Sequence, residues 1–291
     1  ELICYAYMKA LDNYFDVVES YNAAGLALDK NPNSFAVNMI YNLIKAQGMI
    51  SFGETCYMKS LFQTLKNNTN LQLEKELNMT AINLNESSVR ELNEKLQSGS
   101  SGDQFSVNNT VGKHALSVGL TSEINVEING HVGYYCAGMN QQANIVINGN
   151  AGPGLAENMM SGEVRVTGNA SQYAAATAHG GLLIIEGDAS SRCGISMKGV
   201  NIVVGGNIGH MSAFMAQSGC LVVCGDAGDA LGDSVYEAKI YVRGEVKSLG
   251  TDCIEKEMRD EHKKELKELL KQSNMNHKVE DFRRYGSARK L

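Results

Sequence analysis

The six histidines are the residues that could ligate zinc or transfer protons near neutral pH, and they are widely spaced. Zinc sites usually draw their ligands from short spacings such as HxH or HExxH, and no such pair occurs in this chain. The histidines stand singly, at positions 114, 131, 179, 210, 262 and 277. We therefore expect no metal site.

The seven cysteines could form disulfides, a redox pair or an iron–sulfur site, but none stands in a CxxC pair. The cysteines therefore carry no sequence signature of a redox pair or an iron–sulfur site.

Glycines mark the elements that would have to position any functional side chain. Seven of them stand nineteen residues apart, at Gly130, Gly149, Gly168, Gly187, Gly206, Gly225 and Gly244. A fixed period near twenty residues is typical of a solenoid, in which each repeat stacks on the next. Apolar residues stand four and two positions before each glycine, so each repeat contains a strand with an apolar inward face.

These columns predict an all-β solenoid, a parallel β-helix of about seven 19-residue coils. The right-handed form is favoured, because nineteen residues do not divide into the hexapeptides of the left-handed form. Each glycine is expected to adopt a positive φ at a corner, so Gly187→Val should damage the fold. The residues that follow the glycines, from His131 to Glu245, are mostly turn-formers, which we expect to bond to their own backbone.

The repeat also tests the cysteines. Cys136 and Cys193 occupy one column three coils apart, or about 14 Å, which is too far for a disulfide or a shared metal ion. We expect all five cysteines of the repeat region to be structural filler.

The chain divides into four regions. Residues 1–78 are predicted to form a helical appendage, either a divergent tetratricopeptide-like pair or a plain helical bundle. Residues 79–100 form a capping region whose helix begins at the Ser88–Glu91 capping box. Residues 101–253 form the β-helix, and residues 254–291 form a C-terminal helix, over Ile254 to Ser273, with a basic tail. The two helices are expected to cap the two ends of the β-helix.

Composition and charge limit the partners and the cellular location that we expect for this chain. The net charge is −6, and no basic stripe with interleaved aromatic residues is present, so no nucleic-acid partner is expected. There is no run of eighteen apolar residues, so no membrane span is expected either. We expect a cytoplasmic protein, and the start at Glu1 suggests a trimmed chain or a fragment.

The outward column of the strands becomes apolar in the later coils. Ile184, Val203 and Val222 would form an exposed apolar patch, which is unusual on a free monomer. We predict that this patch docks another protein and that Val203→Asp weakens the docking without unfolding the β-helix. The loops are predicted to add docking side chains, namely Tyr134, Tyr135, His210 and Phe214.

Longer strings carry a family resemblance: residues 130–142 (GHVGYYCAGMNQQ), 156–162 (AENMMSG), 178–181 (AHGG), 192–199 (RCGISMKG) and 209–217 (GHMSAFMAQ). Together they resemble the GXGXG-repeat domain at the C-terminus of the glutamate synthase large subunit. The nearest form is the stand-alone subunit of split archaeal-type glutamate synthases and of N-methylglutamate synthase. The superfamily also includes one of the subunits of formylmethanofuran dehydrogenase. The resemblance covers about residues 79–291.

The resemblance implies a scaffold with no catalytic residue and no directly bound cofactor. The chain agrees with this, because it lacks an N-terminal cysteine nucleophile and a flavin-phosphate loop in a βα unit. In the family, a glutaminase subunit releases ammonia, and an FMN and iron–sulfur subunit reduces the 2-iminoglutarate formed with 2-oxoglutarate. The β-helix holds these partners in register. Two alternatives stay open: the same role in N-methylglutamate synthase or formylmethanofuran dehydrogenase, or a free-standing protein-binding adaptor.

Overall fold

The computed structural model describes residues 79–289. The chain separates into two compact units, residues 1–78 and residues 79–291. The predictions for residues 1–78, a helical appendage with a tetratricopeptide-like alternative, lie outside the described residues.

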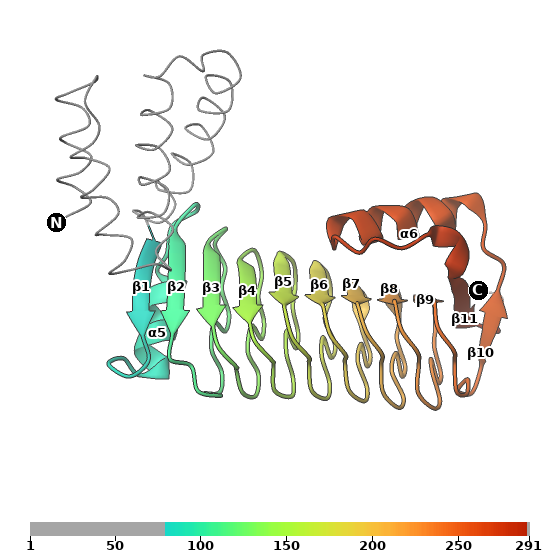
Figure 1. Cartoon of the computed structure of the whole chain (residues 1–291), viewed down its shortest axis with the longest axis horizontal. Coiled ribbons are helices and arrows are strands. Elements are labelled where there is room, and N and C mark those ends of the chain that lie inside the picture. Colours follow the sequence, from blue (N-terminus) through green and yellow to red (C-terminus); the bar gives the residue numbers. More distant parts are fainter. Residues whose placement is uncertain (1–78, 290–291) are drawn as a thin grey trace, which may run out of the picture. The chain divides into compact units, whose positions relative to one another are not determined.

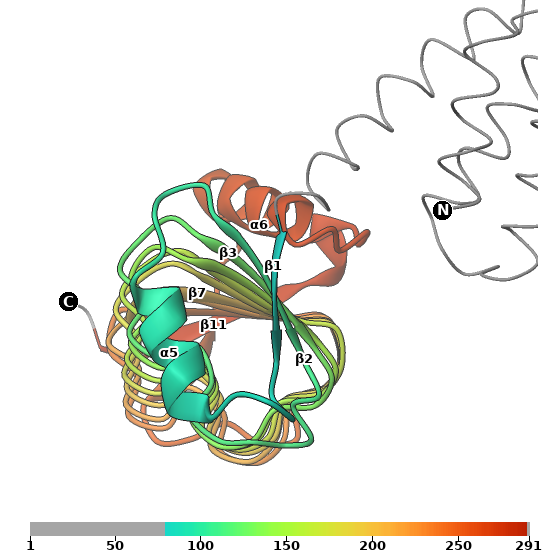
Figure 2. The same cartoon turned by 90° about the vertical axis from the view of Figure 1, so that its left-hand side faces the viewer.

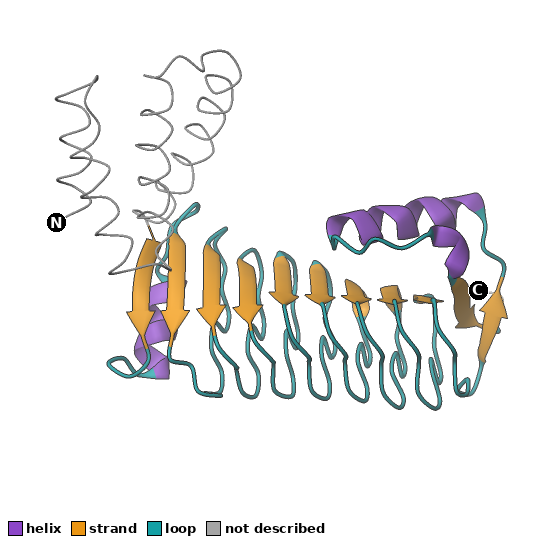
Figure 3. Cartoon of the chain, in the orientation of Figure 1, coloured by secondary structure: helices purple, strands orange, loops and turns teal. Residues whose placement is uncertain are grey.

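The second unit is a parallel β-solenoid, in which consecutive strands lie side by side (Figures 1 and 3). Each strand from β1 to β8 pairs in parallel with the next along the chain, so the parallel series ends at β9. These strands are β1 (Met79–Asn83), β2 (Gln104–Asn108), β3 (Asn125–Asn129), β4 (Asn144–Asn148), β5 (Glu163–Val166), β6 (Leu182–Ile185), β7 (Lys198–Val204), β8 (Ser218–Val223) and β9 (Lys239–Val242).

The pairing register confirms the nineteen-residue repeat. Val126 pairs with Ile145, and Val164 pairs with Leu183. A second row of parallel bridges runs from Val132↔Ala151 through to Ala227↔Val246. The solenoid begins earlier than predicted, because β1 lies within the region assigned to a cap and pairs with β2. The right-handed winding stays a prediction.

The inward columns form one continuous core. The side chains at the two apolar positions of the strands are buried, from Phe105 and Val107 in β2 to Ile240 and Val242 in β9. Cys136, Cys193, Cys220, Cys224 and Cys253 are free and buried, so the prediction that these cysteines are structural filler is confirmed.

The polar residues after the glycines form a ladder between coils, rather than bonding to their own backbone as predicted. The amide of Asn169 donates to Asn150 Oδ1 at 2.8 Å, and the amide of Asp188 donates to Asn169 Oδ1 at 2.8 Å. The same bond recurs at Asn207, Asp226 and Glu245. We call this column, from His131 to Glu245, the polar ladder.

The polar ladder explains the glycine column, and the predicted positive φ is wrong for six of the seven glycines. Only Gly130 has a positive φ, of 124°. At Gly187 a Cβ atom would clash with Asn169 Oδ1, and at Gly206 it would clash with Asp188 Oδ1. At the five glycines from Gly168 to Gly244, glycine is therefore required because the ladder side chain of the preceding coil passes close to the backbone, and not because of backbone conformation.

Left-handed backbone occurs elsewhere in each coil. Gly162, Gly181 and Gly219, which lie just before or at the start of a strand, have φ values of 82°, 86° and 97°. In the loops after the glycines, every second residue has a left-handed backbone, as at Tyr135 (φ 61°) and Met139 (φ 54°). These loops are nonetheless regular, because hydrogen bonds such as Met139 N to Glu157 O (2.8 Å) stack each one on the next.

Helix α5 (Val89–Gln97) closes the first end of the solenoid, as predicted. Ser88 and Glu91 form the expected capping box, and Leu92 and Leu96 are buried in the core. Figure 2 shows α5 lying across the end of the stacked coils.

The C-terminal segment differs from the prediction. Helix α6 (Asp260–Gln272) begins six residues after Ile254, because Cys253–Lys256 forms strand β10. A 3-10 helix (Val279–Asp281) leads into β11 (Arg283–Ser287), which was predicted as a tail. Strand β11 inserts antiparallel between β9 and β10, so strands rather than a helix extend the last coil.

Candidate functional site

The predicted apolar docking patch is buried, so its predicted exposure is wrong. Ile184, Val203 and Val222 are fully buried. Val203 and Val222 pack with Leu266, Leu269 and Leu270 of α6, together with Tyr241 and Phe282. Helix α6 lies over the outer face of the later strands (Figure 1), so this chain covers the patch itself. We call α6 with β10 and β11 the clasp.

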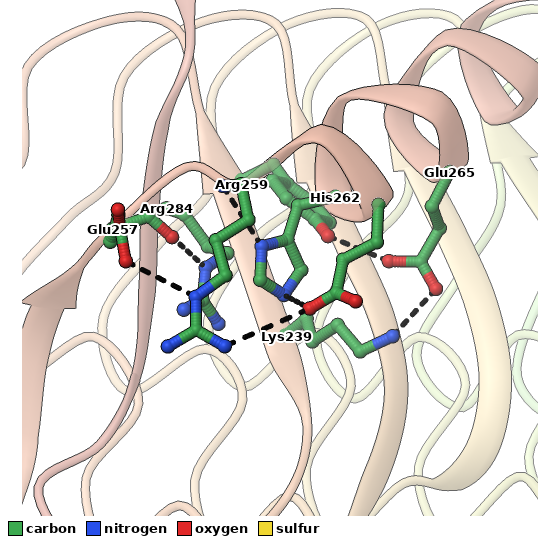
Figure 4. Close-up of polar contacts among 8 residues, drawn as sticks. Lys239, Glu257, Arg259, His262, Glu265 and Arg284 are labelled. Atoms are coloured by element: carbon green, nitrogen blue, oxygen red, sulfur yellow. Dashed lines mark hydrogen bonds and ion pairs between the residues drawn. The ribbon is translucent and has the colours of Figure 1, made fainter.

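A half-buried polar contact fixes the middle of α6. Glu265 accepts hydrogen bonds from Lys239 Nζ and from the Tyr241 hydroxyl, both at 2.6 Å (Figure 4). Burial opposes ionisation of Glu265, but the hydrogen bonds from Lys239 and Tyr241 outweigh it and lower the pKa of this carboxyl. Burial and the neighbouring Glu265 carboxylate raise the pKa of Tyr241. Glu265 is therefore an ionised acceptor that joins the helix to β9.

Both ends of α6 are also held. At the first turn, His262 Nδ1 accepts from the Arg259 amide at 3.2 Å, and Arg284 Nε donates to Glu257 O at 2.9 Å (Figure 4). Burial and the nearby Arg284 guanidinium lower the pKa of His262. At the last turn, Arg165 Nη1 donates to Ser273 O at 3.2 Å, where a cation complements the helix dipole.

None of these clasp residues was predicted as a site from the sequence. The available signals were Tyr241 at the end of the outward apolar column and the leucines of α6 at spacings of three and four residues. Each signal was visible, but nothing in the sequence showed that the two surfaces meet.

The outer face of the earlier strands is polar. Asn148 Nδ2 donates to Asn129 Oδ1 at 2.9 Å, and Asn129 Nδ2 donates to Asn108 Oδ1 at 3.1 Å. Glu127 also accepts from Asn148 Nδ2, at 2.7 Å. Among the described residues, no helix covers this part of the sheet.

The remaining predicted docking residues lie on the loops. We call the surface formed by stacked segments 133–142, 152–161, 171–180, 190–199, 209–218 and 228–237 the loop face. Tyr134 is 51% exposed, and its ring lies 5.6 Å from the half-buried ring of Tyr135. His210 is exposed and Phe214 is half-buried. Tyr134 and His210 share a column four coils apart, or about 19 Å.

Further exposed apolar side chains flank both positions. Met139 and Met160 are 45% and 47% exposed on the first side of the loop face, and Met215 and Tyr236 are 42% and 44% exposed near Phe214. The loop face therefore presents two apolar patches on a rigid, hydrogen-bonded surface.

The described residues offer little acid–base or nucleophilic chemistry. Burial raises the pKa of Cys136 and of Cys193 to about 12, so both thiols stay protonated at neutral pH. Within residues 79–289, no three His, Cys, Asp or Glu side chains gather into a possible metal site. A groove of about 550 Å³ runs along the strand starts and is lined by Asn144, Gly162, Glu163, Gly181, Leu182, Asn201 and Gln272.

A search for membrane spans among the described helices gave none with the length and apolar character required to cross a bilayer.

Comparison with known proteins gives one family and one close relative. The family model described as the GXGXG motif matches residues 63–290. Protein GlxC of Rhizobium meliloti (strain 1021) is 60% identical over 217 residues, which cover 73% of this chain and 95% of GlxC. No solved structure gives a significant match to the chain.

Proposed function

The chain belongs to the GXGXG motif family, and we propose from this that it is a scaffold subunit of a glutamate-synthase-type oxidoreductase complex in the cytoplasm. In this proposal its partners are a glutaminase subunit and a subunit that carries FMN and an iron–sulfur cluster. The chain itself binds no cofactor and docks both partners.

The observation that carries the proposal is the loop face. Tyr134, Met139, Met215 and Tyr236 are each more than 40% exposed, although they stand on backbone fixed by hydrogen bonds between coils. Aromatic and methionine side chains are enriched at protein interfaces. A rigid surface with two such patches can hold two partners, or two parts of one partner, at a fixed separation.

Fixed separation is the physical contribution that a scaffold makes to this reaction. Ammonia released at one site must reach a second site before it escapes, and positioning the two sites lowers the entropic barrier to their coupling. The polar ladder and the clasp both stiffen the solenoid, so the distance between the patches varies little.

Affinity purification of the full chain from its native cell tests the proposal. We expect co-purification of a glutaminase-like chain and of a yellow-brown chain with flavin and iron–sulfur absorbance. Tyr134→Ala and Met215→Ala should each reduce retention of a partner about tenfold, as for interface residues worth about 1.4 kcal/mol.

Val146→Ala, on the outer face of the sheet, is the matched control and should leave retention unchanged. Recovery of a colourless single chain at every salt concentration would contradict the proposal and favour the free-standing adaptor. Identification of co-purified chains would also distinguish glutamate synthase from N-methylglutamate synthase and formylmethanofuran dehydrogenase.

A further inference from the structure

The polar ladder has one unusual member. At five consecutive steps, from Asn150 to Asp226, the acceptor is the Oδ1 atom of Asn or Asp. At the first step the acceptor is His131 Nδ1, which receives the Asn150 amide at 2.9 Å. Because Nδ1 of histidine and Oδ1 of asparagine are both attached to Cγ, the imidazole substitutes for the amide oxygen.

A second histidine makes the same kind of bond beside it. His114 Nδ1 accepts from the Tyr134 amide, also at 2.9 Å. The ring lies so close to Gly133 that a Cβ atom at that position would clash with Nδ1. The contact is therefore built into the coil, and it fixes the backbone of a loop-face residue.

The donor identifies the protonation state of both rings. A backbone N–H can only donate, so each Nδ1 atom must be unprotonated for the bond to exist. Histidine is the side chain whose charge ordinarily changes between pH 5 and 8, whereas the asparagine acceptors do not titrate. These two bonds can therefore be lost in mild acid while the asparagine steps of the ladder persist.

The hydrogen-bond partners of the two rings are uncharged backbone amides. Both histidines are exposed to solvent. Lys113 precedes His114, and its ammonium donates to Leu84 O, while the Tyr134 phenol ring lies 6.5 Å from the His114 ring. The neighbours of His131 are Thr110, whose hydroxyl donates to the His131 carbonyl, and the amide of Asn150. No carboxylate bonds to either ring in the part of the chain that the structure describes.

We propose that His114 and His131 make the early coils of the solenoid pH-sensitive. Protonation of the two imidazoles removes two neighbouring bonds between coils and loosens the loop that carries Tyr134 and Tyr135. If the proposed function is correct, mild acid weakens docking at this patch. That consequence rests on the proposed function, whereas the loss of the two bonds does not.

Amide hydrogen exchange of the full chain tests the proposal, with protection corrected for the intrinsic pH dependence of exchange. Between pH 7.5 and 5.5 we expect protection of the Asn150 and Tyr134 amides to fall about fivefold, as for loss of one ordinary hydrogen bond. The Asp188 amide, whose acceptor is Asn169 Oδ1, serves as the internal reference and should not change.

Matched variants assign the effect. His131→Asn restores the acceptor used in the other coils, so the Asn150 amide should become insensitive to pH while Tyr134 still responds. His114→Asn should give the reverse pattern. Equal wild-type protection at both pH values would overturn the proposal, and so would an unchanged pH response of Asn150 in His131→Asn.

Partner capture at the two pH values separates this proposal from the proposed function. Capture that falls in acid for the wild type, but not for the doubly substituted chain, supports both. If no partner is captured at any pH, the proposed function fails, and the exchange measurement still decides whether the pH-sensitive coils exist.

Discussion

The two halves of the outer sheet face share one backbone and differ in side chains. In the first half, the outward column holds Glu127, Val146 and Arg165 among asparagines that bond to one another in the open. In the second half it holds Ile184, Val203, Val222 and Tyr241, which are all fully buried, and the last three pack with the leucines of α6. Strands pair in parallel in both halves, and the pairing of β7 with β8 in the second half adds one register shift between Lys198 and Asn201.

The difference shows that an apolar outward column can signal an internal cover rather than a docking site. The apolar residues appear over the coils where α6 lies, and Arg165 stands at the boundary, where it donates to the last carbonyls of the helix. The surface left for partners is then the loop face, whose apolar side chains remain exposed.

A negative charge placed in the outward column should give the largest difference in stability between the two halves. Val203→Asp would bury an unpaired carboxylate under α6, so we expect a loss of about 3–5 kcal/mol in the free energy of unfolding. Val146→Asp occupies the same column in the open half and should change stability by less than about 0.5 kcal/mol. Urea denaturation of both variants measures the difference. Equal effects would show that α6 does not cover the second half in solution.

A branched side chain in the glycine column should disrupt the polar ladder, which runs through both halves. In Gly187→Val the new Cβ would displace Asn169 Oδ1 and break one step of the polar ladder. We expect a loss of about 3 kcal/mol, from overpacking together with one lost hydrogen bond. An unaltered melting curve would contradict the close-approach explanation of the glycines.

Removal of one charge should weaken the covered half alone. Glu265→Gln loses the ionic component of the contact with Lys239, and we expect a loss of about 1–2 kcal/mol at pH 7. Glu268→Gln removes the same charge from an exposed position of α6 and is the matched control. Exchange of the Leu269 and Leu270 amides gives a local measure of how firmly α6 is held.

The pH dependence of the covered half follows from the same contacts. The pKa of Glu265 lies below its ordinary value of 4.5, so its contribution is present above pH 4.5 and is lost as the pH falls through the folded-state pKa. The pKa of His262 lies below its ordinary value of 6.5, so acid also opposes the folded form there, beginning near pH 6.5. The difference in stability between wild type and Glu265→Gln should therefore shrink below pH 4.5.

Periodicity made much of the solenoid predictable. The glycine, apolar and polar columns, the core cysteines and the α5 capping box are local or strictly repeated, so the sequence contains each of them directly. The extra coil at β1 could not be found this way, because Met79 pairs with Gln104 across a longer coil that holds α5. Strand β11 was missed because its segment reads as a charged tail when its partner strands are unknown.

The sequence by itself determined that nineteen-residue coils of strand and loop stack on one another, because a repeated pattern needs only its neighbours to define each contact. The tertiary structure alone decided three further features. It showed that α6 folds back over Val203 and Val222, and that the glycines admit the side chains of the polar ladder. It also showed that His114 and His131 accept backbone hydrogen bonds. Each of these depends on atoms from different coils, or from the distant clasp, which only the folded chain brings together.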